Sequence, residues 1–281
     1  MSLGVVIKGP EGIVLAADSR VTLEAQRAGG ERLPVNFDNA TKLLSFSRPF
    51  NQVGPHNFVG AVTYGMAVVG LRTAHSYIPE FEQKVLAQQG KRLTVKDYAH
   101  KLRKFYNERW EESVPKDYAG PPMAFVVGGY DEDAAYGRVF LFQVPGESEP
   151  EEQQPGETNF GMTWGGQLEI ASRLVHGFDP QLTSIVGKEL NINDKEIEKL
   201  HATLRKHLHY PIPYQVLPLQ DCVDLALFLI RTTMVAQRLA IGVRGVGGPI
   251  DVAVVTRTEG LRYVQQKVIH GEEYAYREAE Q

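Results

Sequence analysis

Short apolar runs separated by turn residues mark the first part of the chain. Residues 3–8 and 12–17 are rich in Val, Ile and Leu and are separated by a Gly-Pro-Glu turn. Runs of this length and composition, bounded by turn residues, are typical of strands. Two further runs, over residues 41–46 and 57–65, have the same character. The pattern therefore predicts two pairs of strands at the start of the chain.

Apolar residues recur at helical spacing in the stretches that follow. They do so over residues 66–88 and 94–112, and Thr94 precedes Asp97 at the spacing of a capping box. The second half of the chain contains two more stretches with this periodicity, 167–178 and 220–240. We therefore expect helices in two groups, with strands between them.

Strand patterns return after each group of helices. Residues 123–146 and 249–265 each show an apolar run, turn residues and a second run, as hairpins do. The acidic, proline-containing stretch 146–157 has no hydrophobic period and predicts an exposed, solvated loop. The polar stretch 23–39, with its Gly and Pro residues, predicts another loop.

The order of these elements predicts the fold class. Because the strands come as hairpins, the sheets should be largely antiparallel. Helices grouped between blocks of strands favour a layered arrangement, since each apolar face must be covered. We expect an α+β fold, a four-layer αββα sandwich in which two antiparallel sheets pack face to face and helices cover both outer faces.

Composition narrows the class of protein. The 281 residues are 43% hydrophobic and 23% charged, with a net charge of -4, an ordinary mix for a soluble globular chain. This balance gives no electrostatic case for binding nucleic acid. No apolar run reaches membrane-spanning length and no signal peptide is evident, so we expect no membrane association. The single cysteine, Cys222, cannot form an internal disulfide, which favours a reducing, cytoplasmic location and a core position.

The histidines do not form a metal-binding pattern. Several fall in the charged stretch 201–210, a helix or loop that lacks carboxylate or cysteine partners at ligand spacing. We interpret them as solvated side chains. The sequence signals no metal and no cofactor.

Five stretches in this order carry a resemblance to a known family. They are GIVLAADSR, ATKLLSF, FVGAVTYG before a long helical stretch, FVVGGYDEDAAYGRVFLFQVPG, and GGPIDVAVVTRTEGLRY. Together they resemble the 20S proteasome β-subunit family, whose superfamily of N-terminal nucleophile hydrolases includes the bacterial proteins HslV and Anbu. The resemblance implies one domain over residues 1–281, with insertions near 23–39 and 145–158 and a polar tail near 270–281. It also implies the four-layer sandwich.

The resemblance assigns catalytic residues. In this family the first residue of the mature chain is the nucleophile and its own α-amine is the base. Removal of Met1 would make Ser2 that residue, and Asp18 follows Ser2 by sixteen positions, as the family's aspartate follows its nucleophile. By this match Ser2 attacks, Asp18 orients the site and compensates charge, and Lys42 tunes the amine and the hydroxyl. Arg20 matches the family's arginine two positions after the aspartate.

Each assignment has an ordinary alternative. Ser2 can be only the residue after an initiator methionine, and Asp18 with Arg20 can be a local ion pair at the end of a strand. Lys42 can be a surface lysine. The family more often has threonine as nucleophile, and its serine near the third helix falls here on Gly165 or Gly166. Thr163 would replace that serine only with a shift of register.

The same match places a substrate pocket. Backbone N–H groups near Tyr64 and Gly65 would form the oxyanion hole, which stabilises developing negative charge. Val62 would form the base of the specificity pocket and favour small or apolar side chains. Val21 and Thr22 would line the cleft and pair with an extended peptide.

Two classes of function follow. The first is a peptidase that cuts unfolded or short peptides inside a homo-oligomeric ring. The second is a catalytically silent subunit of the same fold that serves as a ring scaffold. An amidohydrolase for small amides is a further enzymatic alternative, because fold does not determine substrate. The sequence identifies no partner ATPase and no ring size.

Overall fold

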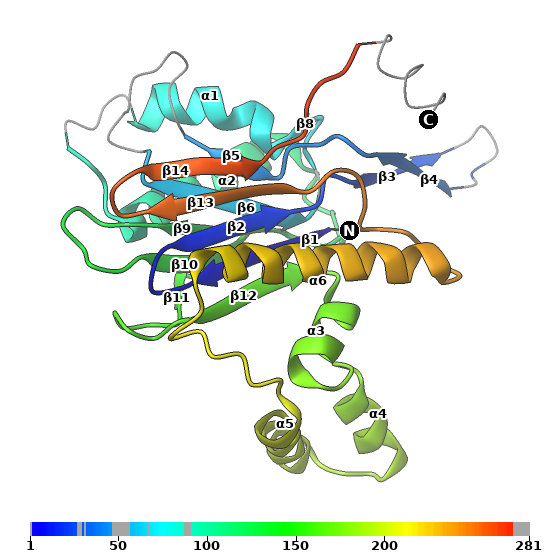
Figure 1. Ribbon diagram of the computed structural model, residues 1–281. Helices are drawn as coiled ribbons and strands as arrows, with labels where there is room; N and C mark the ends of the chain where they lie inside the picture. Colours follow the sequence, from blue (N-terminus) through cyan, green and yellow to red (C-terminus); the bar gives the residue numbers. More distant parts are fainter. Residues whose placement is uncertain are drawn as a thin grey trace, which may run out of the picture.

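Two five-stranded antiparallel sheets form the centre of the molecule in this computed structural model (Figure 1). The structure describes residues 2–26, 30, 32–46, 57–66, 68–86 and 91–271. The first sheet has the strand order β12-β1-β2-β13-β14 and the second has the order β11-β10-β9-β6-β5. This arrangement confirms the expected α+β class and the antiparallel pairing.

The first sheet contains the N-terminal hairpin at its centre. Its strands are β1 (Leu3–Lys8), β2 (Ile13–Ala17), β12 (Gly161–Gly166), β13 (Asp251–Thr256) and β14 (Gly260–Gln265). The strands of the second sheet are β5 (Leu43–Ser45), β6 (Val59–Gly65), β9 (Met123–Gly129), β10 (Arg138–Val144) and β11 (Glu151–Gln153). Both strands of the N-terminal hairpin are buried along their whole length, as expected for continuous apolar runs at the centre of a covered sheet.

Helices cover the outer faces of both sheets. The helices are α1 (Ile78–Phe81), α2 (Val95–Ser113), α3 (Leu168–His176), α4 (Leu182–Glu189), α5 (Asp194–Leu208) and α6 (Leu219–Leu239). The long helix α2 packs on β9 and β10, and α6 packs on β1 and β2. Thr94 caps α2 by accepting a hydrogen bond from the Asp97 N–H at 3.1 Å, which confirms the predicted capping interaction.

Three buried clusters fill the spaces between the layers. One lies between α2 and the second sheet and includes Tyr98, Leu102 and Phe125. Another lies between the first sheet and α3 and α6, and it contains Cys222, which is buried as predicted. A third fills the space between the two sheets. These three layers of apolar contact make the four-layer sandwich that the order of the elements predicts.

The predicted helix over residues 66–88 is wrong in its first part. The chain forms two short strands, β7 (Val68–Val69) and β8 (Arg72–Thr73), before a 3-10 turn over Ala74–Tyr77 and the short helix α1. Gly70 has a φ of 60°, and an added side chain there would collide with Ser113. The chain therefore turns sharply at Gly70 where helical periodicity alone predicts continuation.

Both stretches predicted as loops contain strands. Residues 23–39 fall largely within the two-stranded sheet of β3 (Val21–Gln26) and β4 (Arg32–Phe37). In the acidic stretch, Glu152 pairs with Arg138 at 2.7 Å, and β11 joins the edge of the second sheet. Pairing with a distant arginine offsets the acidic charge that favours a solvated loop.

Helices α4 and α5 project from the body below the sheets (Figure 1). The structure places most of the histidine-containing stretch 201–210 in α5, so the helical alternative is the correct one there. No described helix combines the length and apolar character needed to cross a membrane. Residues 272–281, most of the predicted polar tail, lie outside the described residues.

Candidate active site at the start of the first strand

The N-terminal hairpin brings Ser2 and Asp18 to one end of the first sheet. In the antiparallel pair, Gly4 lies opposite Ala17, so the residues beyond this pair continue from the same end. Ser2 is 3% exposed and Asp18 is 1% exposed. Pairing along the hairpin therefore places both polar residues at one buried corner of the molecule.

The Asp18 carboxylate is the centre of a hydrogen-bond network. One oxygen accepts from the Leu3 N–H at 3.0 Å and from Lys42 Nζ at 2.8 Å. The other accepts from the N–H groups of Arg20 at 3.1 Å and Gly247 at 3.0 Å. Four donors satisfy this buried carboxylate and hold it in one orientation, as a buried charge requires. The bond to Leu3 also fixes the backbone next to Ser2.

Lys42 lies in the same buried corner. Its ammonium donates to Asp18 and also to the backbone carbonyl of Arg20. Burial lowers the pKa of Lys42 from its usual value, and the Asp18 carboxylate opposes that shift. Lys42 is thus a fixed positive group next to Ser2, and not the surface lysine of the alternative interpretation.

A small cavity joins Ser2 to the lysine. Its lining includes Ser2, Val21, Lys42, Thr63 and Tyr64. The cavity volume is about 10 Å³, roughly the space of one water molecule. Burial raises the pKa of Tyr64 to about 12, so its hydroxyl stays protonated near neutral pH. The cavity therefore offers room for a bridging water beside the hydroxyl of Ser2.

Glycines in β12 lie against the Ser2 backbone. Gly166 has a φ of 100°, and an added Cβ would collide with the carbonyl oxygen of Ser2. That oxygen accepts from the Gln167 N–H at 2.7 Å. At Gly165, an added Cβ would collide with the ring of Tyr64. This close packing explains why glycines occupy the positions where the resembling family has a serine.

Two sequence-based assignments are not met by the structure. Thr163 lies opposite Val6 in β12, and its hydroxyl is 3.3 Å from the Gln154 amide, away from Ser2. In this structure the Thr163 hydroxyl is therefore placed toward Gln154. Val62 is buried in the core between the sheets and does not line the Ser2 cavity. The residues of β6 that line the cavity are the next two, Thr63 and Tyr64.

The turn after β6 is held by the segment around Pro122. Tyr64 lines the cavity, but the Met66 N–H donates to the Pro122 carbonyl at 3.1 Å. Gly65 has a φ of 89°, and an added Cβ would collide with the same carbonyl. The segment around Pro122 therefore holds this turn in place beside the cavity.

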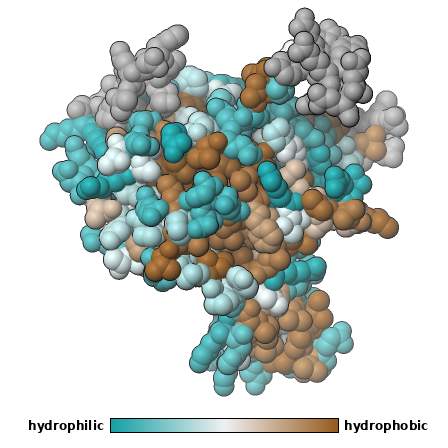
Figure 2. All heavy atoms as spheres, viewed as in Figure 1, coloured by the Kyte–Doolittle hydropathy of each residue, from teal (hydrophilic) through white to brown (hydrophobic). Residues whose placement is uncertain are grey.

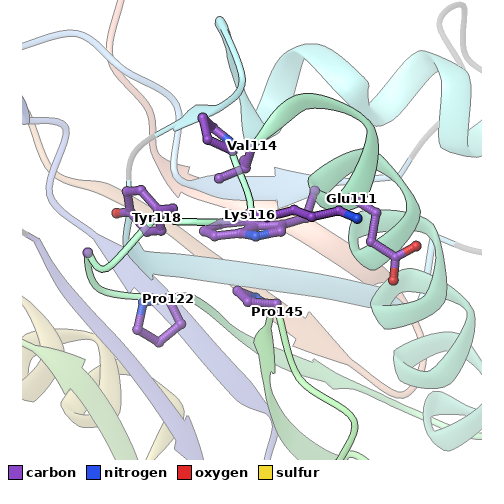
Figure 3. Close-up of a pocket in the computed structure, with 9 residues that line it drawn as sticks. Glu111, Val114, Lys116, Tyr118, Pro122 and Pro145 are labelled. Carbon is purple, nitrogen blue, oxygen red and sulfur yellow. The ribbon is translucent and has the colours of Figure 1, made fainter.

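A second hollow is lined in part by Pro122 (Figure 3). Its volume is about 310 Å³, and Tyr118, Pro122 and Pro145 line it together with Trp110. The rings of Trp110 and Tyr118 meet edge to face with centroids 5.5 Å apart. This aromatic hollow shares Pro122 with the turn beside Ser2.

Of the predicted cleft residues, Val21 lines the cavity and Thr22 does not. The Thr22 hydroxyl donates to the Asn36 side chain at 2.7 Å, across the β3–β4 pair. Arg20 pairs with Asp38 at 2.5 Å, and this contact raises the pKa of Arg20 and lowers that of Asp38. Arg20 therefore supports the wall of the site from outside.

Sequence reasoning missed three residues of this corner. Gly247 holds Asp18 through a backbone N–H, Asp38 neutralises Arg20, and Thr63 presents a buried hydroxyl that has no hydrogen-bond partner in the structure. The position of Thr63 directly before Tyr64, a predicted site residue, was the signal that could have identified it. Within the described ranges, no group of three or more His, Cys, Asp or Glu side chains is placed to hold a metal ion.

Comparisons with known proteins agree with the fold. No protein-family model matches the chain, and no curated protein matches it. A solved Gly-1 mutant of Anbu from Hyphomicrobium sp. strain MC1 is similar, with a TM-score of 0.54 and 12% identity over 99% of this chain and 91% of that chain. Anbu from Yersinia bercovieri, described as an ancestral beta-subunit, has a TM-score of 0.55 and 15% identity over 99% and 92%. The helical assembly of the Anbu complex from Pseudomonas aeruginosa has a TM-score of 0.56 and 15% identity, over 99% of this chain and 91% of that chain. At these identities, the similarity establishes an Anbu-like sandwich fold.

Proposed function

We propose that this protein is a proteasome-like peptidase in which Ser2, exposed as the N-terminal residue by removal of Met1, is the nucleophile. The observation that carries this proposal is the corner in which Asp18 fixes the backbone beside Ser2 and also binds Lys42. Ser2 and Lys42 line one cavity. The Anbu-like fold supports the proposal because the resemblance in the sequence points to the same superfamily.

The chemistry needs a base next to the hydroxyl. The freed α-amine would have an ordinary pKa of roughly 7.7–8.0, close to working pH, so part of it is neutral and can accept a proton. The amine takes the proton of the Ser2 hydroxyl, directly or through a water in the cavity, as the oxygen attacks the peptide carbonyl. The positive charge of Lys42 favours the neutral amine and stabilises negative charge that develops on the serine oxygen.

The remaining steps return the proton and release both products. Backbone N–H groups near Tyr64 and Gly65 would bind the oxyanion of the tetrahedral intermediate. Collapse of that intermediate breaks the C–N bond, and the ammonium of Ser2 gives its proton to the departing amine. Water, deprotonated by the same α-amine, then hydrolyses the ester on Ser2 and restores the hydroxyl. No cofactor takes part in this proposed sequence.

An assembly of several copies would enclose such a site. One of the similar structures is a helical assembly of the Anbu complex. Figure 2 shows apolar surface on the projecting arm of α4 and α5 and where α6 ends. The exposed side chains include Ile185 and Leu190 on the arm, Leu239 at the end of α6 and Ile241 just after it. Exposed apolar surface of this kind favours contact between copies, and homo-oligomerisation is part of the proposal.

The first experiment is intact-protein mass with N-terminal sequencing on material from a native-like host. The proposal expects a chain that begins with Ser2 and that cleaves fluorogenic peptides. Ser2→Ala should reduce cleavage to background with an unchanged unfolding midpoint. Ser19→Ala is the matched control, because this buried hydroxyl has no hydrogen-bond partner in the structure.

Three outcomes would contradict the proposed peptidase. Peptide cleavage that survives Ser2→Ala would exclude Ser2 as the nucleophile. Retention of Met1 with no cleavage would favour the silent ring subunit, because the Ser2 nitrogen would then be an amide and no base. Cleavage of small amides but not peptides would favour the amidohydrolase alternative.

A further inference from the structure

A larger pocket lies on the helix side of β12, between this strand and helices α3 and α5. Its volume is about 330 Å³, at the lower end of the range typical of small-molecule sites. In Figure 1, α3 and α5 lie below the edge of the sheet that β12 forms. We call it the β12–α5 pocket, and it is separate from the cavity beside Ser2.

The inner wall of the pocket is apolar and aromatic. Met162 and Phe178 are buried, and Trp164 and Leu168 complete this wall. Such a surface favours an apolar or aromatic body in the bound molecule, because binding would remove that body from water.

The outer wall carries positive charge. Arg205 and His201 come from α5, and His176 comes from the end of α3. The Arg205 guanidinium is 2.8 Å from His176 Nε2. Burial and the nearby Arg205, His209 and His201 lower the pKa of His176 to about 4. His176 is therefore neutral near pH 7, and its Nε2 accepts a hydrogen bond from the guanidinium.

No carboxylate balances this wall. No ion pair joins Arg205 to an acidic side chain in the part of the chain that the structure describes. Asp179 lies beside two lining residues, but its carboxylate is bound to Arg173 at 2.5 Å and accepts from the Gln181 N–H. Arg205 is the cation closest to His176, and its guanidinium is one cause of the lowered pKa of that histidine. The pocket thus has an uncompensated positive edge.

One buried donor in the lining is also unused. The indole nitrogen of Trp164, Nε1, is buried and has no hydrogen-bond partner in the structure. An unpaired buried N–H is costly, but this one is closed off from the pocket, so the case for an acidic ligand rests on Arg205.

We propose that the β12–α5 pocket binds a small carboxylic acid with an aromatic or branched apolar body. The carboxylate lies on the Arg205 guanidinium, whose planar fork matches a carboxylate in two parallel hydrogen bonds. The apolar body lies against Trp164, Met162 and Phe178. Neutral His176 holds the guanidinium in position from the other side.

The site does not depend on the proposed peptidase. It shares β12 with the Ser2 corner, since Trp164 precedes Gly166 by two positions in the same strand. Binding is nevertheless a property of the pocket alone, and the test below measures no cleavage. A failure of the peptidase proposal therefore leaves this one standing, and the reverse also holds.

The test is isothermal titration calorimetry of the full chain with phenylacetate and with phenylacetamide, its uncharged analogue. We expect phenylacetate to bind with a dissociation constant below about 1 mM and phenylacetamide to bind at least about tenfold more weakly. Arg205→Gln should weaken phenylacetate binding by about tenfold or more, because it removes the charged partner. His201→Gln should have a smaller effect.

Lys206→Gln is the matched control. It removes the same charge from the next position of α5 and lies outside the pocket lining. Phenylacetate binding to this variant should equal that of the wild type. Three results would each overturn the proposal. They are the absence of any heat of binding up to about 10 mM phenylacetate, equal affinity for phenylacetate and phenylacetamide, and an equal loss of affinity in Arg205→Gln and Lys206→Gln.

Discussion

Two polar regions border the same strand, β12, and they differ in whether their charged side chains form ion pairs. In the Ser2 corner, Lys42 is paired with Asp18 and Arg20 with Asp38. In the β12–α5 pocket, Arg205 faces a neutral histidine and binds no carboxylate among the described residues. The corner is buried, whereas Arg205 is exposed.

Burial explains the difference. A buried charge without a partner is strongly destabilising, so the corner must balance each charge within the chain. An exposed arginine keeps its water and costs little when unpaired. The corner can therefore hold a fixed geometry around Ser2, while the pocket keeps a cation free for an outside anion. A fixed geometry suits the proposed catalytic corner, and an unpaired cation suits the proposed ligand pocket.

The largest expected effect on stability comes from removing the carboxylate of the buried Asp18–Lys42 ion pair. Asp18→Ala removes the partner of Lys42 and leaves the N–H groups of Leu3, Arg20 and Gly247 without their acceptor. We expect the free energy of unfolding to fall by about 3–5 kcal/mol, the usual cost of breaking a buried ion pair. Urea titration followed by circular dichroism measures it.

The contrast with the pocket supplies the control. Arg205→Gln should change the free energy of unfolding by less than about 0.5 kcal/mol, since it alters an exposed side chain without an ion pair. Equal losses in Asp18→Ala and Arg205→Gln would show that burial does not separate the two regions.

A smaller effect concerns the backbone that holds Ser2. Gly166→Ala and Gly156→Ala both place a side chain at positive φ, at 100° and 95°. Only at Gly166 would the new Cβ collide, with the Ser2 carbonyl, because no atom lies within 4 Å at Gly156. Backbone strain at positive φ is common to both variants, so the difference in their free energies of unfolding reports the cost of the collision alone. We expect Gly166→Ala to be the less stable by about 1–3 kcal/mol.

Hydrogen exchange at Gln167 checks the cause. The Gln167 N–H donates to Ser2, and its protection should fall in Gly166→Ala but not in Gly156→Ala. Equal stability of the two variants would mean that β12 can move away from the Ser2 strand at little cost.

The sequence predicts best where local signals and long-range pairing agree. The β1–β2 hairpin follows from two apolar runs and a turn, and the α2 cap follows from Thr94 and Asp97. The β3–β4 pair was missed because apolar side chains of β4, Val35 and Phe37, are exposed, so the strand shows no alternation of buried and exposed positions there. Strand β11 was missed because Arg138, fourteen positions from Glu152, stabilises it.

The candidate site also contains residues that the sequence predicts and residues that it does not. Asp18 was predicted from its spacing to Ser2, and Lys42 was predicted from its position at the start of the KLLSF stretch. Gly247 contributes a backbone N–H, which every residue except proline has, so its role has no sequence signal. Val62 does not line the cavity, whereas the next two residues, Thr63 and Tyr64, do. Catalytic roles for these residues stay predictions.

The smallest expected effect tests the rim of the corner. The Arg20–Asp38 pair is only partly buried, with the Asp38 side chain 41% exposed, so solvent screens it. Asp38→Asn should lower the free energy of unfolding by under about 1 kcal/mol at neutral pH. Arg20 lowers the folded-state pKa of Asp38 below its ordinary 3.8, so the pair stabilises above that value and its contribution is lost as pH falls through the folded-state pKa. Urea titrations of both proteins from about pH 7 to pH 2 should therefore converge in acid. A gap that stays constant across this range would mean that the Asp38 carboxylate is not the stabilising group, and that only buried pairs in this corner carry charge-dependent stability.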